Sequence, residues 1–417
     1  MKRIASLLSI AVIALASCQK EDMELGMAEG IDTHAGSKYI SLTKAEADLT
    51  ASTNIFAFKL FSQVREDRDD ETILLSPFSA SMALGMTATG AEGETERQMR
   101  AVLGIGEVTK EEMTEYYSKM LDGLAKADPY VDLKIANSIW IHKDFPVKEA
   151  FVRNAEKAFD SIIENRDFGS PETLKEINDW VSDKTEGTIK DLLDELSPDE
   201  RMALVNALYF EGKWRYAFAG SKKAPFRNAS GGRTRTDMMY AVGTLSYADR
   251  DGWEMLRLPY GTEAFSMSII LPPEGEKFQG TTLDYDRWLS LNGTSRPCEV
   301  NMNIPAFMTS DEFNLIDPLK ALGMTDAFEM NADFSAMSDQ ALRIGKVKQK
   351  TFIEVSETGT KASAATVVME ARGSPGGYEV PEYQPEKVNF DADRPFYFVI
   401  SEVSTKAVLF IGQVTEL

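Results

Sequence analysis

Histidine and cysteine are scarce in this 417-residue chain, which has two of each. Cys18 and Cys298 cannot build a disulfide framework or a cysteine metal cluster, and we expect Cys298 to be a small apolar residue at a strand edge. His34 lies in a polar N-terminal segment and His142 in an Ile-His-Lys-Asp turn, neither of which suggests a nucleophile–histidine pair. The sequence therefore predicts neither an enzyme nor a cofactor or metal site.

Positive charge is also in deficit. The chain has 45 Lys and Arg against 66 Asp and Glu, which gives a formal net charge of −21. A surface of this sign repels nucleic acid and anionic polysaccharide, and no basic run offsets it. We therefore expect no nucleic-acid partner and no heparin-like activator.

The N-terminal apolar run is too short to span a bilayer. It extends from Ile4 to Ala16 after two basic residues, which is typical of a signal peptide over residues 1–17. It ends in Leu-Ala-Ser-Cys, a sequence that resembles a bacterial lipobox and predicts lipidation of Cys18. Residues 18–42 would then form a lipidated cysteine and a flexible tether.

The residues after that cysteine bear on localisation. Gln-Lys-Glu-Asp at 19–22 resembles the surface-export signal of Bacteroidetes lipoproteins. We expect an outer-membrane lipoprotein that is exposed at the cell surface and contacts the membrane through Cys18. A periplasm-facing or secreted form is the alternative.

Residues 43–417 show no internal linker. Helical and strand-like patterns are interspersed, with a helix predicted at 172–190 and a strand at 300–304. This pattern favours one large α+β domain.

The most informative segment is Glu-Thr-Gly-Thr-Lys-Ala-Ser-Ala-Ala-Thr at 357–366. In a pleated strand, Thr360, Ala362, Ala364 and Thr366 would share one face of small side chains. Such a face can enter an existing sheet without overpacking it. A small-residue edge strand or a flexible linker is the plainer interpretation.

The flanks of this segment favour insertion. A regular buried strand is predicted at 351–355, and Gly-Ser-Pro-Gly-Gly at 373–377 is turn-forming. Order is expected again at 390–400, in Phe-Asp-Ala-Asp-Arg-Pro-Phe-Tyr-Phe-Val-Ile. A long exposed loop, about 357–385, is therefore predicted between two anchored strands.

These stretches resemble the serpins, a family of serine protease inhibitors. The hinge matches the inhibitory pattern at Glu357, Gly359, Thr360, Ala362, Ala364, Ala365 and Thr366. Further stretches match in family order: SPFSASMALGMTATGAEGETERQM, INDWVSDKTEGTI, LVNALYFEGKW, LPYG with SMSIILP, LGMTDAF followed by ADFSAM, and FDADRPFYFVI. The resemblance covers residue 43 to the C-terminus. It implies a metastable α+β serpin fold with three β-sheets, about nine helices and an exposed reactive-centre loop.

The resemblance also implies a function and roles for residues. The chain would be a monomeric suicide substrate that forms a covalent complex with trypsin-like or elastase-like serine proteases. Papain-like cysteine proteases are a further class of target that the resemblance allows. Trp214 would be the breach tryptophan, and Ser79 and Asn206 would lie in the shutter. Gln349 stands where the family commonly has histidine, so a modified shutter network is expected.

The scissile bond has several candidates. Counting from the hinge places it at Gly373–Ser374, but glycine is a poor specificity residue. Arg372, with Gly373 following, suits a trypsin-like protease with an acidic pocket and is our preferred site. Val368 or Met369 would suit elastase-like or chymotrypsin-like enzymes.

Two other functions stay open. The chain could be a non-inhibitory serpin that acts as a protease substrate or a surface binding protein, although the inward hinge positions carry no bulky or charged residue. It could also be a surface lipoprotein that serves as an adhesin or nutrient-binding module on this scaffold, for which an exposed aromatic platform would be expected.

Overall fold

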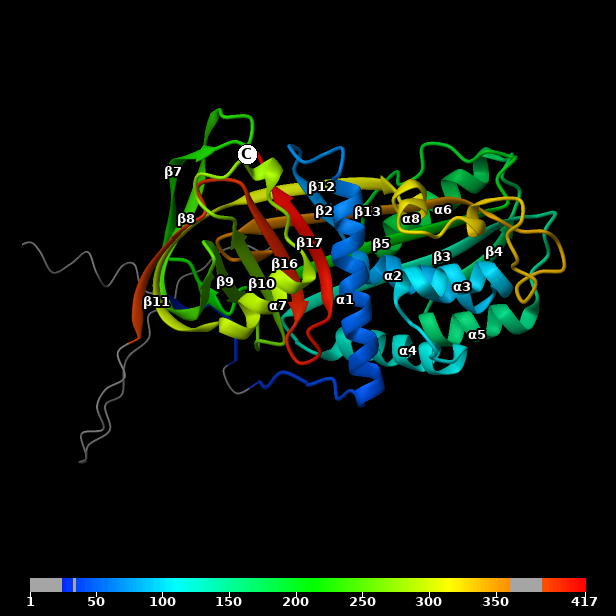
Figure 1. Cartoon of the computed structure of the whole chain (residues 1–417), viewed down its shortest axis with the longest axis horizontal. Helices are drawn as coiled ribbons and strands as arrows, with labels where there is room; N and C mark the ends of the chain where they lie inside the picture. Colours follow the sequence, from blue (N-terminus) through cyan, green and yellow to red (C-terminus); the bar gives the residue numbers. More distant parts are fainter. Residues whose placement is uncertain (1–24, 33–34, 361–384) are drawn as a thin grey trace, which may run out of the picture.

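Two large sheets and a group of helices form the layered α+β structure of Figure 1. The computed structural model describes residues 25–32, 35–360 and 385–417. The six-stranded sheet has, in order, β12 (Phe307–Asn314), β13 (Ile344–Ser356), β14 (Gly359–Thr360), β5 (Met202–Lys213), β3 (Val131–His142) and β4 (Ile162–Arg166).

The nine-stranded sheet and a two-stranded pair complete the strand layers. In the larger sheet the order is β15 (Glu386–Asp391), β11 (Arg296–Pro305), β8 (Arg233–Arg250), β9 (Trp253–Pro259), β10 (Phe265–Leu271), β16 (Phe396–Glu402), β17 (Val408–Val414) and β2 (Ile73–Leu75), with β7 (Gly220–Arg227) paired to β8. The pair consists of β1 (Gly26–Met27) and β6 (Tyr216–Ala217).

Eight α-helices lie in the described part of the chain, close to the nine that the sequence suggested. They are α1 (Lys44–Arg65), α2 (Pro77–Thr89), α3 (Gly93–Leu103), α4 (Lys110–Lys126), α5 (Glu149–Phe159), α6 (Pro171–Lys184), α7 (Tyr285–Thr294) and α8 (Ile316–Ala321). Short 3₁₀ turns occur at Phe278–Gly280 and Asp326–Phe328. Capping boxes start α1 at Thr43 and α4 at Thr109, since each threonine accepts from a backbone N–H that the helix leaves unpaired. None of the described helices is long and apolar enough to cross a membrane.

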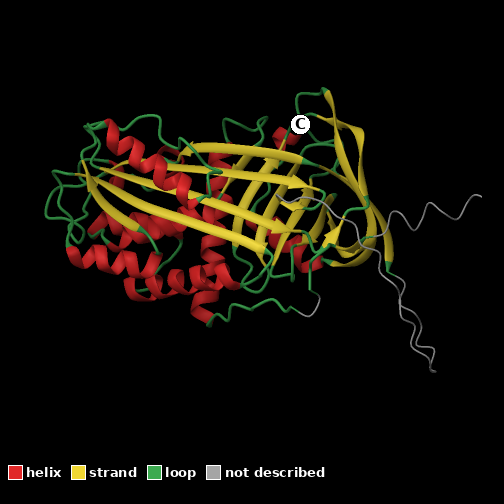
Figure 2. Cartoon of the chain, turned by 180° about the vertical axis from the view of Figure 1, so that it is seen from behind, coloured by secondary structure: helices red, strands yellow, loops and turns green. Residues whose placement is uncertain are grey.

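Helices cover both faces of the six-stranded sheet. Helix α2 packs against β3 and β5 on the inner face, which belongs to the main hydrophobic core. On the outer face, Ile177 and Val181 of α6 pack with Ala203, Val205 and Ala207 of β5 in a second hydrophobic cluster. Figure 2 shows the long strands of this sheet in front of most of the helices. The centre of the sheet is therefore enclosed on both sides.

The element predictions hold with shifted ends. Strands β13 and β11 contain the strands expected at 351–355 and 300–304. The helix expected at 172–190 ends at Lys184, because Glu186 and Gly187 have φ of 51° and 74°, a left-handed conformation that stops a right-handed helix.

The two rare residue types lie inside the fold. Cys298 is a buried free thiol in β11, which lies between β15 and β8, so the expected position at a strand edge is wrong. His142 ends β3 and is buried, with its ring edge-on to Phe145 and Phe168. Its Nδ1 accepts from the Asp144 N–H at 3.3 Å, which fixes the turn that follows.

Residues 25–32, called here the N-terminal strap, are packed against the body. Gly26 and Met27 pair with Ala217 and Tyr216, and Leu25 contacts the main core. The tether expected over 18–42 therefore does not describe these residues. Composition alone could not reveal their strand pairing, because the partner strand is about 190 positions away.

Candidate functional site: the seam of the six-stranded sheet

In the six-stranded sheet, β13 and β5 pair directly along one part of their length and are separated at one end. Strands β13 and β5 pair in parallel from Ile344 opposite Met202 to Thr351 opposite Leu208; we call this pairing the seam. At one end, which we call the mouth, β14 lies between the two strands and pairs antiparallel with both. The chain after β13 has therefore already entered the sheet by two residues.

A tight turn places the hinge in the mouth. Glu357 and Thr358 form a two-residue turn after β13, and Gly359 then lies opposite Ser356 and Lys213. Gly359 has φ +142°, and a Cβ there would lie 2.8 Å from the Lys213 Cα. Only glycine fits this position, because both the backbone conformation and the space exclude a side chain.

Part of the predicted site can be located in the structure. Glu357, Gly359 and the backbone of Thr360 lie at the mouth. The other hinge positions, the scissile-bond candidates and the lipidation site lie outside the described residues: Ala362, Ala364, Ala365, Thr366, Val368, Met369, Arg372, Gly373, Ser374 and Cys18.

Trp214 joins the two strands that flank the mouth. It follows β5, is 1% exposed and stacks on Tyr260 with ring centroids 4.3 Å apart. Its indole Nε1 donates to the Ser356 carbonyl of β13 at 2.8 Å, and its backbone N–H donates to the Thr358 carbonyl at 3.4 Å. The side chain thus holds the end of β13 beside the end of β5.

Beneath the seam, a buried polar network joins α2 to three strands. Asn206 of β5 donates from Nδ2 to Ser79 of α2 and to Asn137 of β3, the latter at 2.5 Å. Gln349 of β13 donates to Asn206 Oδ1 at 2.7 Å and to the Ser76 carbonyl at 2.8 Å, and accepts from the Ser76 N–H at 2.9 Å. The structure therefore brings Ser79, Asn206 and Gln349 together, and the Gln349–Asn206 bond crosses the seam.

Sequence reasoning missed two members of this network and one neighbour. Ser76 and Asn137 supply partners to Gln349 and Asn206, and Thr351 donates to the Leu74 carbonyl at 2.7 Å. Asn137 and Ser138 interrupt the apolar residues of the Ile-Ala-Asn-Ser-Ile-Trp stretch of a strand. A polar residue in such a run, which is costly to bury unpaired, was the available signal.

The connection from α6 to β5 crosses the outer face of the seam. Lys350 donates to the Lys190 carbonyl at 3.0 Å, and Lys346 donates to the Glu195 carbonyl at 2.8 Å. Lys346 also lies 3.4 Å from Glu200. Burial raises the pKa of Glu200 above its usual value, although the Lys346 ammonium opposes this shift. A strand that enters the seam must pass beneath this connection.

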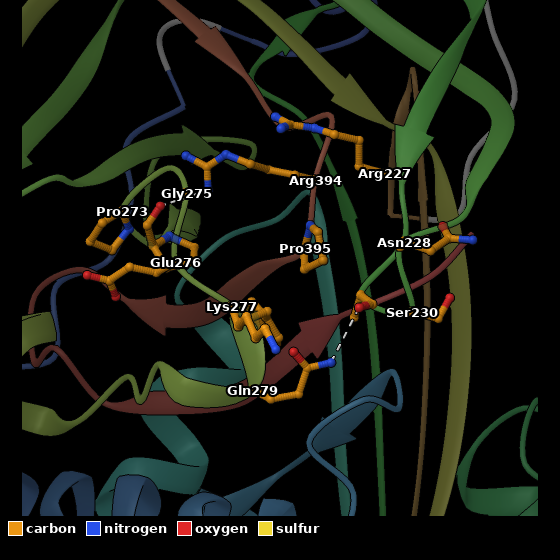
Figure 3. Close-up of a pocket in the computed structure, with 14 residues that line it drawn as sticks. Arg227, Asn228, Ser230, Pro273, Gly275, Glu276, Lys277, Gln279, Arg394 and Pro395 are labelled. Atoms are coloured by element: carbon orange, nitrogen blue, oxygen red, sulfur yellow. Dashed lines mark hydrogen bonds between the residues drawn. The ribbon is translucent and has the colours of Figure 1, made fainter.

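A separate cleft of about 620 Å³ lies between the β7–β8 turn and the segment after β10. Figure 3 shows Arg227, Arg394 and Lys277 among its lining residues. Arg227 pairs with Asp393 at 3.0 Å and with Glu274 at 3.4 Å. Arg394 donates to the Pro272 carbonyl at 2.7 Å, and burial lowers its pKa. Because neighbouring carboxylates and carbonyls engage both arginines, the cleft does not form a simple anion site.

Within residues 25–32, 35–360 and 385–417, no group of three or more His, Cys, Asp or Glu side chains could hold a metal ion. The arrangement at the seam is instead suited to a conformational change. It consists of a strand that has begun to enter, two parallel strands that can separate, and one hydrogen-bond network across the gap.

Comparison with known proteins adds an independent finding. The family model described as "Serpin (serine protease inhibitor)" matches residues 51–417. An uncharacterized serpin-like protein of Methanosarcina acetivorans is 33% identical over 380 residues, which cover 89% of this chain and 88% of that protein. A leukocyte elastase inhibitor of Sus scrofa is 33% identical over 384 residues, with coverage of 88% and 99%. The native-state structure of tengpin, a thermophilic serpin, has a TM-score of 0.79 at 30% identity and covers 94% of this chain and 100% of its own.

Proposed function

The chain belongs to the serpin family, and from that premise we propose that it inhibits serine proteases as a suicide substrate. The observation that carries the proposal is β14, which pairs with β13 and β5 on either side at the mouth of the seam. A strand held between two parallel strands needs only their separation to extend. Cleavage of the loop would free the chain to do so.

The register of β14 predicts where each hinge residue would arrive. Thr360 is opposite Val355 and Gly212, so without a bulge Ala362 would lie between Ile353 and Phe210. Opposite residues of adjacent strands point to the same face, and Val355, Ile353 and Phe210 are buried. The small-residue face of the hinge would therefore meet the main core.

The same register supports a specific role for Thr366. It would arrive between Gln349 and Asn206, the pair whose 2.7 Å hydrogen bond crosses the seam. Insertion must break that bond, and a threonine hydroxyl can donate to one amide oxygen and accept from the other amide. The buried network would thus be rejoined through the new strand instead of being left unpaired.

The opposite face of the new strand would also be accommodated. Ala365 and Val367 would lie beside Ala207 and Val205, which pack against α6. The entering segment has small or apolar residues at these positions, so it can be buried without an unpaired polar group.

Strand length bears on the scissile bond. Strand β13 has 13 residues, so a partner of equal length beginning at Gly359 would end near residue 371. Cleavage after Arg372 would supply a strand that fills the seam. Cleavage after Val368 or Met369 would leave its far end open, and cleavage at Gly373–Ser374 fits the length equally well.

The proposed chemistry belongs to the protease. Its serine hydroxyl attacks the Arg372 carbonyl, the Arg372–Gly373 bond breaks, and the Gly373 amine leaves with a proton. The resulting ester joins the protease to the new end of the hinge. If about ten inserted residues each gain a net hydrogen bond near 1 kcal/mol, insertion releases on the order of 10 kcal/mol. This energy is comparable to the stability of a folded domain, so it can distort the protease before the ester hydrolyses.

We further propose that Cys18 is lipidated and holds the inhibitor at the outer surface of the cell. The lipobox-like sequence and the following Lys-Glu-Asp support this location. Mass spectrometry of the membrane-extracted protein would detect the lipid on Cys18. Protease accessibility in intact cells would report the side of the membrane.

The inhibitory function is tested with residues 19–417 and trypsin, elastase and chymotrypsin in separate reactions. With trypsin, we expect a covalent complex that survives denaturing electrophoresis. We also expect a released C-terminal peptide whose mass corresponds to residues 373–417. Arg372→Ala is the matched variant and should lose the complex with trypsin. Cleavage by all three proteases without any complex would refute inhibition and favour the substrate-like alternative.

A further inference from the structure

The N-terminal strap crosses the end of the sheet at which the hinge enters. Its three backbone anchors are Leu25 N–H to the Val242 carbonyl at 2.7 Å, Ala28 N–H to the Arg215 carbonyl at 3.0 Å, and Asp32 N–H to the Tyr130 hydroxyl at 2.7 Å. Between them, β1 pairs with β6. The strap therefore binds as an added strand, a common mode of peptide recognition.

The Leu25 side chain fills a dedicated apolar socket. A Cβ at Gly243 would lie 2.6 Å from the Leu25 Cδ1, so the socket depends on a residue without a side chain at that position. Leu25 lines a small apolar pocket together with Trp214, Tyr216, Phe218, Leu245, Leu258, Pro259 and Met302. This complementarity is more than a flexible tether requires.

Residues 214–217 connect the strap to the hinge. On one side, Trp214 donates to the carbonyls of Ser356 and Thr358. On the other side, the Arg215 carbonyl accepts from Ala28, and Tyr216 and Ala217 pair with β1. One four-residue stretch is therefore bound simultaneously to the strap and to the residues that begin insertion.

We propose that the surface formed by β6, Gly243 and Trp214 is a peptide-binding groove, occupied in the same chain by residues 25–32, and that its occupancy holds the mouth of the seam closed. Its ligand class is an extended peptide with a leucine at the position of Leu25. Undocking frees residues 214–217 and speeds loop insertion in the absence of any protease. The effect on insertion rests on the proposed function, whereas occupancy of the groove does not.

The test compares variants of the otherwise complete chain. Leu25→Asp places a charge in the socket, and Glu29→Ala, at an exposed strap position, is the matched control. We expect Leu25→Asp to increase hydrogen exchange at the strap amides at least 10-fold. We also expect it to shorten at least 10-fold the half-life for spontaneous conversion to a more heat-stable form, followed by native electrophoresis at raised temperature. Glu29→Ala should change neither by more than about 2-fold.

A compensating pair guards against simple misfolding. Gly243→Ala should undock the strap by collision with Leu25, because the added Cβ would lie 2.6 Å from Leu25 Cδ1 and 2.8 Å from Leu25 Cβ. The same change in a Leu25→Gly background, which lacks both of these atoms, should cause little further exchange. The peptide Leu-Gly-Met-Ala-Glu-Gly-Ile-Asp, added to Leu25→Asp, should bind the vacated groove and slow conversion.

Each outcome decides one part of the proposal. Unchanged exchange in Leu25→Asp would overturn the groove, and faster exchange with an unchanged conversion half-life would overturn its control of the seam. Neither readout uses a protease. A chain that fails to inhibit but still shows both effects would refute the proposed function and leave the strap intact.

Discussion

Replacing Gln349 by alanine should weaken the closed seam more than any neighbouring surface change. Gln349 is fully buried and makes three hydrogen bonds. The Ser76 carbonyl keeps a partner in the Ala80 N–H at 3.2 Å. The Ser76 N–H and Asn206 Oδ1 each lose the partner that Gln349 provides.

The expected cost follows from those two orphaned groups. A buried polar group left unpaired costs about 1–3 kcal/mol, so the pair contributes roughly 2–6 kcal/mol. The four heavy atoms removed leave space for a water molecule, which can recover part of this loss. We therefore expect the free energy of unfolding to fall by about 3 kcal/mol.

The assay is urea unfolding followed by tryptophan fluorescence, with spontaneous conversion measured in parallel. Lys348→Ala is the matched control, because Lys348 is the preceding residue of β13, points to the outer face and pairs with a partly exposed Glu312. Such a pair is worth about 1 kcal/mol or less. A Gln349→Ala protein within 0.5 kcal/mol of the wild type, with unchanged conversion, would show that the network does not hold the seam.

Three further predictions concern the mouth and the far end of the seam. Thr360→Arg should leave the rest of the fold intact but convert the inhibitor into a substrate, because Thr360 already pairs with Val355 and Gly212 and a large charge at this position opposes both β14 and its extension into the seam. Lys361→Arg should keep inhibition, and equal complex yields on denaturing gels would contradict this. Gly359→Ala should expel β14 and reduce complex formation with trypsin several-fold, since its Cβ would collide with the Lys213 backbone, and wild-type inhibition would exclude that collision. Glu200→Gln should be more stable than the wild type above pH 5. The pKa of Glu200 is raised in the folded state, so the native state binds the proton more tightly than the unfolded chain does. The free energy of unfolding of the wild type therefore falls as pH rises past about 4.5. Unfolding midpoints that stay parallel between pH 4 and 7 would argue against it.

Local sequence patterns predicted the positions of strands better than they predicted contacts between distant residues. The alternation at 351–355 and 300–304 located β13 and β11, because half-buried strands repeat every two residues. The family resemblance brought Ser79, Asn206 and Gln349 to attention, and they do meet beneath the seam. Ser76 and Asn137 escaped notice, because hydrogen bonds between distant segments leave no periodic signal. The strap was missed for the same reason: its composition is that of a linker, and its strand pairing depends on a socket assembled from β8 and the residues after β5.

The strap also sets the distance and direction of the proposed membrane anchor. If the lipid is on Cys18, only residues 19–24 separate it from a docked Leu25, which allows a span of about 25 Å at most. The end of the sheet that carries the reactive loop would then stand next to the bilayer. A captured protease, carried along the seam, would finish on the pole that points away from the cell. In such an orientation, a chain that inhibits as proposed would intercept proteases at the lipid surface and displace them outward.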